Sequence, residues 1–376
     1  MTTTKNNEHK KLNVPNLRFP EFQGEWEKCT LEDVMNFSTT RVNSSELNED
    51  NYVSTENMLQ DFQGVVEAKS VPEDVNVISF SCGDILISNI RPYLKKVWKA
   101  TFNGGCSSDV FVLKANNNIE SDYLHYVIAN DKFINFVMSG AKGVKMPRGD
   151  KKQMKTYPLS LPQIQEQKKI GKMLSLLDER IATQNKIIEK LQSLIKGIRN
   201  DVYGKLRKSV GFNAMISDVL SYEQPQPYIV ENTEYTAEGI PVLTANKAFV
   251  LGYTSETNGI YDKGDCIIFD DFTLDCKYVD FPFKVKSSAI KILTAKNKEL
   301  LRYTFEFLKY LDLSTEEHKR HYIAETQNQE FILPTEQIVK TIAYIFSTLS
   351  VRMETAVKQR NVFEKQKQYL LRQMFI

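Results

Sequence analysis

The sequence predicts an α/β (α+β) protein built as an internal pseudo-twofold repeat. Two mixed domains are each followed by one long helix, and the two helices pair as an antiparallel coiled coil. The segment LPQIQEQKKIGKMLSLLDERI, at 161–181, returns in a weaker copy as LPTEQIVKTIAYIFSTLSVRM, at 333–353. Heptad spacing follows each Leu-Pro pair, and the segments before the two helices share landmarks in the same order. A segment repeated nearly half a chain apart indicates a duplicated structural unit.

Composition sets the class of protein. The 376 residues are enough for two or three domains, and 41% hydrophobic with 26% charged residues is ordinary for a globular protein. The net charge of +2 means that a nucleic-acid partner would be met by local basic patches. The polar start MTTTKNNEHKK lacks the apolar core of a secretory signal, so 1–14 is expected to be a flexible tail. Five widely spaced cysteines without C-x-x-C, and no apolar run that could span a bilayer, predict a cytoplasmic protein with reduced thiols.

The two domains are expected at 15–160 and 206–332. Both are rich in β-branched and aromatic runs, and both place a Gly-Asp pair before an apolar strand. The paired landmarks are, in order, YVSTENM and PVLTANK, GDILIS and GDCIIF, CSSDVFVLKA and KSSAIKIL, and the aromatic stretches DYLHYVIANDKFINFVM and LLRYTFEFLKYL.

The first long helix is expected at 161–205, because no proline occurs from Ile164 to Lys205 and the apolar residues follow a heptad. Pro162 suits the first turn, and Gln184, the single polar heptad member, could fix the register as buried amides do in coiled coils. A helix of about 40 residues is roughly 60 Å long. An ordinary surface helix is the alternative, but a heptad kept for about five repeats exceeds what a core helix needs.

The second long helix is expected at 333–376. Its pattern is weaker, because Arg360 and Lys367 occupy positions that are aliphatic in the first copy. Two such helices separated by a folded domain would lie antiparallel and form a spacer of fixed length. The residues expected to pair them are Ile170, Leu174, Leu177, Ile181, Ile188, Leu191, Ile195, Ile198, Ile342, Phe346, Leu349, Met353, Phe363 and Leu370.

Basic residues gather in two segments of the first domain, NIRPYLKKVWK and AKGVKMPRGDKKQMK. The second mixes Gly and Pro with six cations, which suits a loop that lies along phosphates, although a solvated charged loop is the plainer alternative. In the second domain, polar and cationic residues are expected to meet DNA as well. The candidates for DNA binding are Arg91, Lys95, Lys96, Lys142, Lys145, Arg148, Lys151, Lys152, Thr244, Asn246, Lys247, Thr273, Lys277, Lys319 and Arg320.

The sequence contains no phosphate-binding G-x-x-x-x-G-K-[ST], no dinucleotide-binding G-x-G-x-x-G and no motif for methyl transfer. Asp270, Asp271, Asp275 and Lys277 could hold Mg²⁺ as in nucleases, but Asp-x-Lys arises often by chance and the first half lacks the carboxylates. His318 and His321 have no convincing further metal ligands and are expected at the surface. We therefore expect no catalytic residues and no metal site.

Two α/β domains, each leading into a Leu-Pro helix, resemble the specificity subunit of type I restriction-modification systems over the whole chain. LSLPQIQEQKKIGKMLSLLDERI and its copy carry the resemblance, together with PNLRFPEFQGEWEKCTLEDV, GDILISNIRPYLKK and DFPFKVKSSAIKIL. It implies that each domain is a target recognition domain for one DNA half-site. The helices would fix the gap and dock two methyltransferase subunits, with restriction subunits completing the complex. It also implies no cofactor in this chain, with S-adenosylmethionine, ATP and Mg²⁺ on the partner subunits.

The second copy departs from this pattern. It has other residues at the positions that match Glu166-Gln167 and Leu177-Asp178-Glu179, and its domain has no basic Gly-Pro loop. Its phosphate contacts would then come from other cations. Two alternatives stay open beside DNA recognition. One is a self-contained Mg²⁺-dependent nuclease that uses the acidic cluster with Lys277. The other is a partner-docking or silent copy that does not read DNA.

Overall fold

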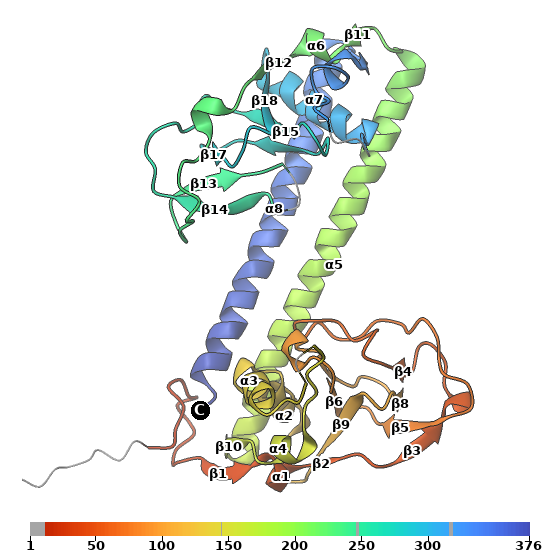
Figure 1. Ribbon diagram of the computed structural model, residues 1–376, viewed down its shortest axis with the longest axis vertical. Helices are drawn as coiled ribbons and strands as arrows, with labels where there is room; N and C mark the ends of the chain where they lie inside the picture. The colour runs from red at the N-terminus through yellow and green to blue at the C-terminus, as the bar shows by residue number, and fades with distance from the viewer. Residues whose placement is uncertain (1–11, 144, 246–247, 316–318) are drawn as a thin grey trace, which may run out of the picture. The chain divides into compact units, whose positions relative to one another are not determined.

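The computed structural model describes residues 12–143, 145–245, 248–315 and 319–376 (Figure 1). The chain divides into two compact units. Unit 1 comprises Met1–Thr183 with Arg360–Ile376, and unit 2 comprises Gln184–Gln359. Each unit therefore holds one mixed domain and parts of two long helices. Across the described residues, no helix combines the length and the apolar character needed to cross a membrane.

The domain of unit 1 is built around two four-stranded sheets and several helices. Its strands are β1 (Glu27–Thr30), β2 (Met35–Phe37), β3 (Arg41–Asn43), β4 (Tyr52–Val53), β5 (Asn76–Phe80), β6 (Ile85–Ser88), β7 (Val97–Lys99), β8 (Gly104–Cys106), β9 (Val110–Ala115) and β10 (Pro158–Leu161). Its helices are α1 (Leu31–Val34), α2 (Ser121–Ile128), α3 (Asp131–Ser139) and α4 (Lys151–Lys155), with 3₁₀ turns at Ser44–Glu46 and Pro92–Leu94. The sheets have the orders β2-β9-β6-β7 and β3-β5-β8-β4.

The domain of unit 2 repeats this arrangement with fewer strands in its second sheet. Its strands are β11 (Ala214–Met215), β12 (Leu220–Glu223), β13 (Ile240–Leu243), β14 (Val250–Thr254), β15 (Cys266–Asp270), β16 (Cys276–Val279), β17 (Lys284–Val285), β18 (Ile290–Ala295) and β19 (Glu330–Phe331). Its helices are α6 (Ile216–Val219) and α7 (Lys298–Leu311), with 3₁₀ turns at Gln226–Tyr228 and Thr326–Asn328. The sheets have the orders β12-β18-β15-β16 and β14-β13-β17.

The four-stranded sheets β2-β9-β6-β7 and β12-β18-β15-β16 have the same strand order along the chain and antiparallel neighbours throughout. GDILIS forms the central strand β6 and GDCIIF forms its counterpart β15. Gly83 and Gly264 open these strands with φ of +93° and +95°, a conformation that favours glycine. The repeat predicted from the sequence landmarks is therefore confirmed in the topology.

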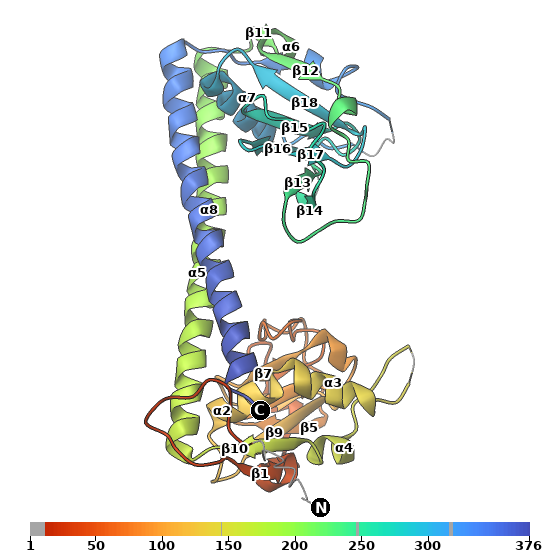
Figure 2. The same ribbon diagram turned by 90° about the vertical axis from the view of Figure 1, so that its left-hand side faces the viewer.

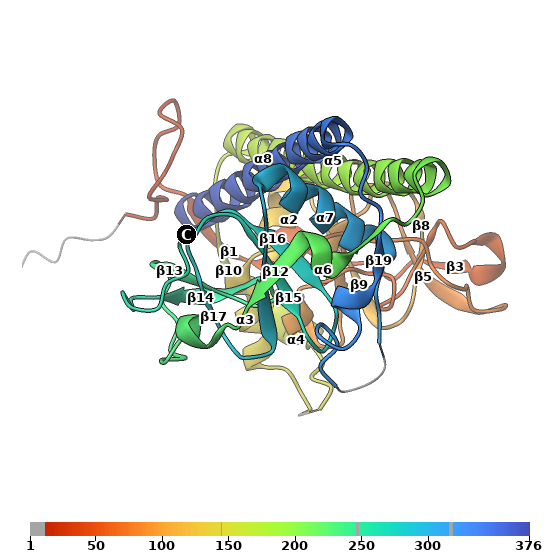
Figure 3. The ribbon, with the colours of Figure 1, turned by 90° about the horizontal axis from the view of Figure 1, so that it is seen from above.

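Each domain has three layers, which are the helices, the four-stranded sheet and the second sheet. Alternate residues of the central strands face the two outer layers. In β6, Ile85 and Ile87 pack with the helices, and Leu86 packs toward the second sheet. In β15, Ile267 and Phe269 face the helices, and Cys266 and Ile268 lie in the other core. Because successive strand residues point to opposite faces, a sheet buried on both sides needs such a continuous apolar run. Figure 2 shows α2 and α3 over the sheet of unit 1, and Figure 3 shows α7 close to the long helices in unit 2.

The two long helices are α5 (Ile164–Ser209) and α8 (Glu336–Gln373). The sequence places them at 161–205 and 333–376. The first begins later because Leu161 pairs with Glu27 in the β1-β10 ladder. It ends later because Leu206 packs in the core of unit 2, and Gly211, with φ of +75°, donates to the Leu206 carbonyl at 3.2 Å and closes the end.

Candidate nucleic-acid interface

The two basic segments of the first domain lie side by side. Asn89, next after β6, donates its N–H to the Asp109 carbonyl at 2.7 Å and accepts from the Gly149 N–H at 3.0 Å. The Arg91 N–H donates to the Pro147 carbonyl at 2.8 Å. These backbone hydrogen bonds join the loop at 89–96 to the loop at 142–150. The structure thus brings together cations that are about 50 residues apart in the sequence.

Six of the eight cations predicted in unit 1 have exposed side chains: Arg91, Lys142, Lys145, Arg148, Lys151 and Lys152. Asp150 caps α4 by accepting from the Lys152 N–H at 2.7 Å, which fixes the first turn where two of these lysines lie. Lys142 pairs with Asp150 at 3.3 Å, and Lys151 lies over the rings of Phe37 and Phe111. These contacts orient the cations but leave them at the surface.

Lys95 and Lys96 are partly buried and have structural contacts. The Lys95 ammonium is 2.8 Å from an Asp131 carboxylate oxygen. Lys96 donates to the Thr55 carbonyl at 2.5 Å, and burial lowers the pKa of its ammonium. These two lysines hold loops together within the domain, so the exposed six form the basic surface of unit 1.

Unit 2 contains the same junction without the basic loop. Asp271, next after Asp270 of β15, donates its N–H to the Ala289 carbonyl at 2.8 Å and accepts from the His321 N–H at 3.0 Å. Asp271 thus lies where Asn89 lies in unit 1, and the turn before β18 lies where the turn before β9 lies. The segment that closes the domain meets the central strand at the same point in both units.

The sequence candidates in unit 2 are more scattered. Thr273 is exposed in the turn after β15, and Lys277 is half-buried in β16, 3.4 Å from Asp275. Thr244 is buried after β13, where its N–H donates to the Phe249 carbonyl at 3.0 Å. Lys319 and Arg320 have exposed side chains, and Lys319 pairs with Glu325 at 2.9 Å. Asn246 and Lys247 lie outside the described residues.

The acidic cluster considered for a nuclease has structural partners. Asp270 accepts from the N–H groups of Phe272 and Thr273, each at 3.0 Å, and so shapes the turn. Asp275 binds Lys309 at 2.6 Å. Asp271 is buried against Lys291 at 3.3 Å. Among the described residues, no group of three or more His, Cys, Asp or Glu side chains is arranged to hold a metal ion.

The expectation that His321 lies at the surface is wrong, because its side chain is buried. The Asp271 carboxylate accepts from the N–H groups of His321 and Tyr322, at 3.1 and 2.8 Å, and draws this segment into the domain. No local sequence feature indicates this contact, since His321 and Asp271 are 50 residues apart. His318 lies outside the described residues.

The residues predicted to pair the helices are buried or half-buried in both units. In unit 1, Ile170, Leu174 and Leu177 pack in one core with Leu370, and Phe363 lies against it. In unit 2, Ile342 and Phe346 are in the core that Ile195, Ile198 and Leu349 flank. The Gln184 side-chain oxygen is buried and has no hydrogen-bond partner among the described residues.

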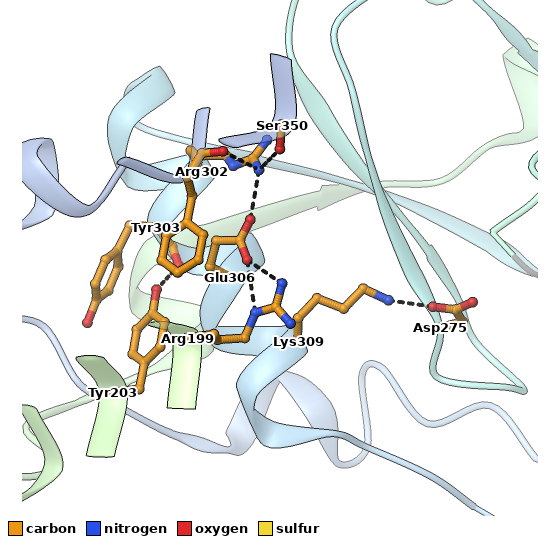
Figure 4. A network of polar contacts seen from close by, with 9 residues as sticks. Arg199, Tyr203, Asp275, Arg302, Tyr303, Glu306, Lys309 and Ser350 are labelled. Atoms are coloured by element: carbon orange, nitrogen blue, oxygen red, sulfur yellow. Dashed lines mark hydrogen bonds and ion pairs between the residues drawn. The ribbon is translucent and has the colours of Figure 1, made fainter. Parts of the chain in front are cut away.

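A network of ion pairs, which the heptad pattern does not reveal, attaches α7 to both long helices in unit 2 (Figure 4). The buried Glu306 carboxylate accepts from Arg199 of α5, at 2.7 and 2.9 Å, and from Arg302 at 2.8 Å. Arg302 also donates to the Ser350 hydroxyl and to the Phe346 carbonyl of α8. The three helices are therefore joined by charge as well as by apolar packing.

Glu166 and Gln167, the Glu-Gln pair of the first Leu-Pro segment, are both buried in unit 1. Glu166 accepts two hydrogen bonds from Arg18, each at 2.8 Å. The Gln167 amide donates to the Pro162 carbonyl and accepts from the Glu120 N–H, each at 2.8 Å. The pair therefore fastens the N-terminal segment and the start of α2 to the first turn of α5.

Comparison with known proteins finds similarity to one group of proteins, in sequence and in fold. The family of type I restriction modification DNA specificity domains matches residues 23–193. The chain is 44% identical over 126 residues to the type I restriction enzyme EcoR124I/EcoR124II specificity subunit of Escherichia coli, covering 32% of this chain and 31% of that protein. It is 37% identical over 103 residues to the MjaVIII specificity subunit of Methanocaldococcus jannaschii, covering 27% and 24%. The chain thus matches about a third or less of the length of these relatives.

The fold extends the likeness over nearly the whole chain. The crystal structure of the type I restriction-modification system S subunit from M. genitalium superposes with a TM-score of 0.70 at 15% identity, covering 96% of this chain and 99% of that chain. The family match at residues 23–193 covers the domain of unit 1 and the first part of α5. The chain is thus similar in sequence to type I specificity subunits over part of its length, and it shares the fold of one S subunit over nearly all of it.

Proposed function

We propose that this chain is the DNA sequence-specificity subunit of a type I restriction-modification complex. Each domain reads one half-site of a bipartite target in double-stranded DNA, and the paired helices set the gap between them. The observation that carries the proposal is the shared junction after β6 and β15, which occurs once per domain beside exposed cations. Two copies of one structure in a single chain suit a target made of two parts.

The lengths of the helices support the role of a spacer. α5 has 46 residues and α8 has 38. At 1.5 Å per residue, even the shorter helix is roughly 57 Å long, which exceeds the ~34 Å between sites one DNA turn apart. Helices of this length can therefore bridge the two half-sites of a bipartite target.

The remaining roles follow from this assignment. The chain acts in the cytoplasm and scaffolds two methyltransferase subunits together with restriction subunits. Chemistry belongs to those partners, which bind S-adenosylmethionine, ATP and Mg²⁺, and this chain supplies recognition without catalysis or a cofactor of its own. The nuclease alternative loses support because its carboxylates shape a turn and pair with lysines in the domain.

The first test is to co-express the chain with a cognate methyltransferase subunit and map methylated adenines across a bacterial genome. A two-part motif with a fixed gap is expected. Replacing residues 15–160 with the corresponding domain of another relative should change one half of the motif only. An unmethylated genome despite a stable complex would overturn the proposal.

The second test reverses charge on the basic surface of unit 1. Changing Lys145, Arg148 and Lys151 together to Glu should weaken DNA binding by the purified chain and reduce its salt dependence, by a slope of about 1 per lost phosphate contact. The control is the same reversal at three exposed lysines of α5, Lys186, Lys190 and Lys196. Equal binding by the two triple variants would favour a partner-docking protein that does not read DNA.

A further inference from the structure

Arg148 and Arg320 occupy the same position in the two units. Each immediately precedes the residue whose N–H donates to the backbone carbonyl that follows the central strand. In unit 1 this donor is Gly149, bound to Asn89, and in unit 2 it is His321, bound to Asp271, both at 3.0 Å. The equivalence is invisible in the sequence, because AKGVKMPRGDKK and the segment around Arg320 have no similar spacing.

Both arginines also contact the turn before the strand that pairs with the central strand, which is β9 in unit 1 and β18 in unit 2. The Arg148 guanidinium is 3.3 Å from the Asp109 carboxylate. The Arg320 guanidinium donates to the Ser288 carbonyl at 3.2 Å and to the Ser288 hydroxyl at 3.3 Å. The two side chains keep exposures of 55% and 48%. Each guanidinium is therefore oriented by its own domain while much of it faces solvent.

The charges beside these arginines indicate what they would contact. Each lies near a carboxylate, Asp109 at 3.3 Å and Asp271 at 3.7 Å. A phosphate that approached Arg148 would meet the partly exposed Asp109 carboxylate as well, and like charges repel. The O6 and N7 atoms of guanine are neutral acceptors, and their spacing matches the two parallel N–H groups of a guanidinium. In unit 2 the carboxylate would repel a phosphate more weakly, because Lys291 pairs with the same Asp271 at 3.3 Å and partly neutralises its charge.

We propose, on the basis of the proposed function, that Arg148 and Arg320 are matched base-reading residues, each contacting a guanine edge in the half-site of its own domain. An arginine held by a carboxylate or a serine is already oriented for this contact. The other exposed cations of unit 1 would then contact phosphates and set position, and the arginine would contribute to sequence choice.

The experiment compares the wild-type chain with R148Q and R320Q, each in complex with a methyltransferase subunit, on a plasmid library of random sequence. Wild type should methylate a two-part motif that contains a G·C pair in each half. R148Q should lower discrimination at one G·C pair of one half by roughly 10- to 100-fold, and R320Q should do so in the other half. R148K keeps the charge but lacks the planar fork, so it should relax the same base pair.

Two exposed lysines away from these junctions, Lys28 of β1 and Lys296 before α7, serve as controls as K28Q and K296Q. Thermal unfolding of every variant checks that the fold is intact. A motif that stays unchanged in R148Q and R320Q, while wild type methylates a bipartite target, overturns the base-reading role but leaves the proposed function standing. Uniform weakening at all sequences would instead identify phosphate contacts. A wild-type complex without a bipartite motif would refute the proposed function itself.

Discussion

Asp178 of α5 and Lys367 of α8 form an ion pair inside unit 1, with the ammonium 2.5 Å from a carboxylate oxygen. The other oxygen of Asp178 accepts from the Tyr126 hydroxyl of α2 at 2.7 Å. Lys367 occupies a heptad position that is aliphatic in the first copy, and its ion pair with Asp178 explains why a cation stands there. In the second Leu-Pro copy, Ser350 takes the place of Asp178 and accepts from Arg302 of α7. The same helix position thus anchors a domain helix in both units.

Replacing Asp178 by Ala should destabilise the chain by about 1–2 kcal/mol, because both the ion pair and the Tyr126 hydrogen bond are lost. Urea unfolding of the full chain measures the change. The control is Asp201→Ala, which removes another Asp–Lys pair of α5 whose side chains are 60% and 75% exposed. That control should cost less than about 0.5 kcal/mol. Equal effects would mean that Asp178 contributes no more than a surface pair.

Glu306→Ala should have a larger effect, about 3–5 kcal/mol, because two arginines with side-chain exposures of 15% and 10% would lose their carboxylate. Thermal unfolding of the full chain is the measurement. Glu336→Ala removes an exposed partner of Lys340 and should shift the midpoint little. A Glu306 variant as stable as the Glu336 variant would contradict the structural role of the network.

Gly171→Ala should destabilise unit 1 although alanine is the better helix former. A Cβ at this position of α5 would lie 2.7 Å from the Asp122 Cβ and 3.2 Å from the Tyr123 nitrogen, so α2 would have to move. Gly197 of the same helix has no atom within 4 Å of an added Cβ. Gly197→Ala should therefore stabilise by about 0.5–1 kcal/mol. Opposite signs in denaturant unfolding are expected, and equal signs would refute the close approach of α2.

His125 of α2 should make stability depend on pH. Burial lowers the pKa of its imidazole to about 4, with Lys367 and Lys99 adding to the effect and Asp178 and Asp122 opposing it. The unfolded chain binds a proton near pH 6.5 that the folded chain resists, so stability falls as pH drops from about 6.5 toward 4. The loss is on the order of 3 kcal/mol, since each unit by which the pKa is lowered corresponds to about 1.4 kcal/mol. His125→Phe should flatten this part of the stability–pH curve, and an unchanged slope would assign it to other groups.

The heptad spacing of the helices and the internal repeat of the domains allowed the fold to be predicted from the sequence. Ile170, Leu174 and Leu177 recur at heptad spacing, and the Gly-Asp strands recur with the same neighbours. These patterns report local geometry and burial, which sequence spacing encodes directly. The two ends of α5 were harder to predict, because they depend on Leu161 pairing in a strand and on Leu206 packing in a core.

The candidate interface was only partly accessible. The basic segments were visible as charge, but their joining through Asn89 and Gly149 depends on how the loops close on the sheet. Lys95 and Lys96 looked like surface cations, and nothing local indicates their contacts with Asp131 and Thr55. The match between the two arginines could not be predicted, because it lies in a shared hydrogen-bond position and in no shared motif.

The core of unit 1 includes Leu370, Met374 and Phe375, from the other end of the chain, with the Phe375 ring stacked on Tyr123 at 5.2 Å. During synthesis the ribosome delivers residues 1–183 long before 360–376. At 5–20 residues per second, the intervening stretch takes roughly 10–35 s. Until then, part of the apolar surface of the first domain stays exposed to solvent. Unit 1 therefore completes its core after unit 2, although most of it is synthesised first.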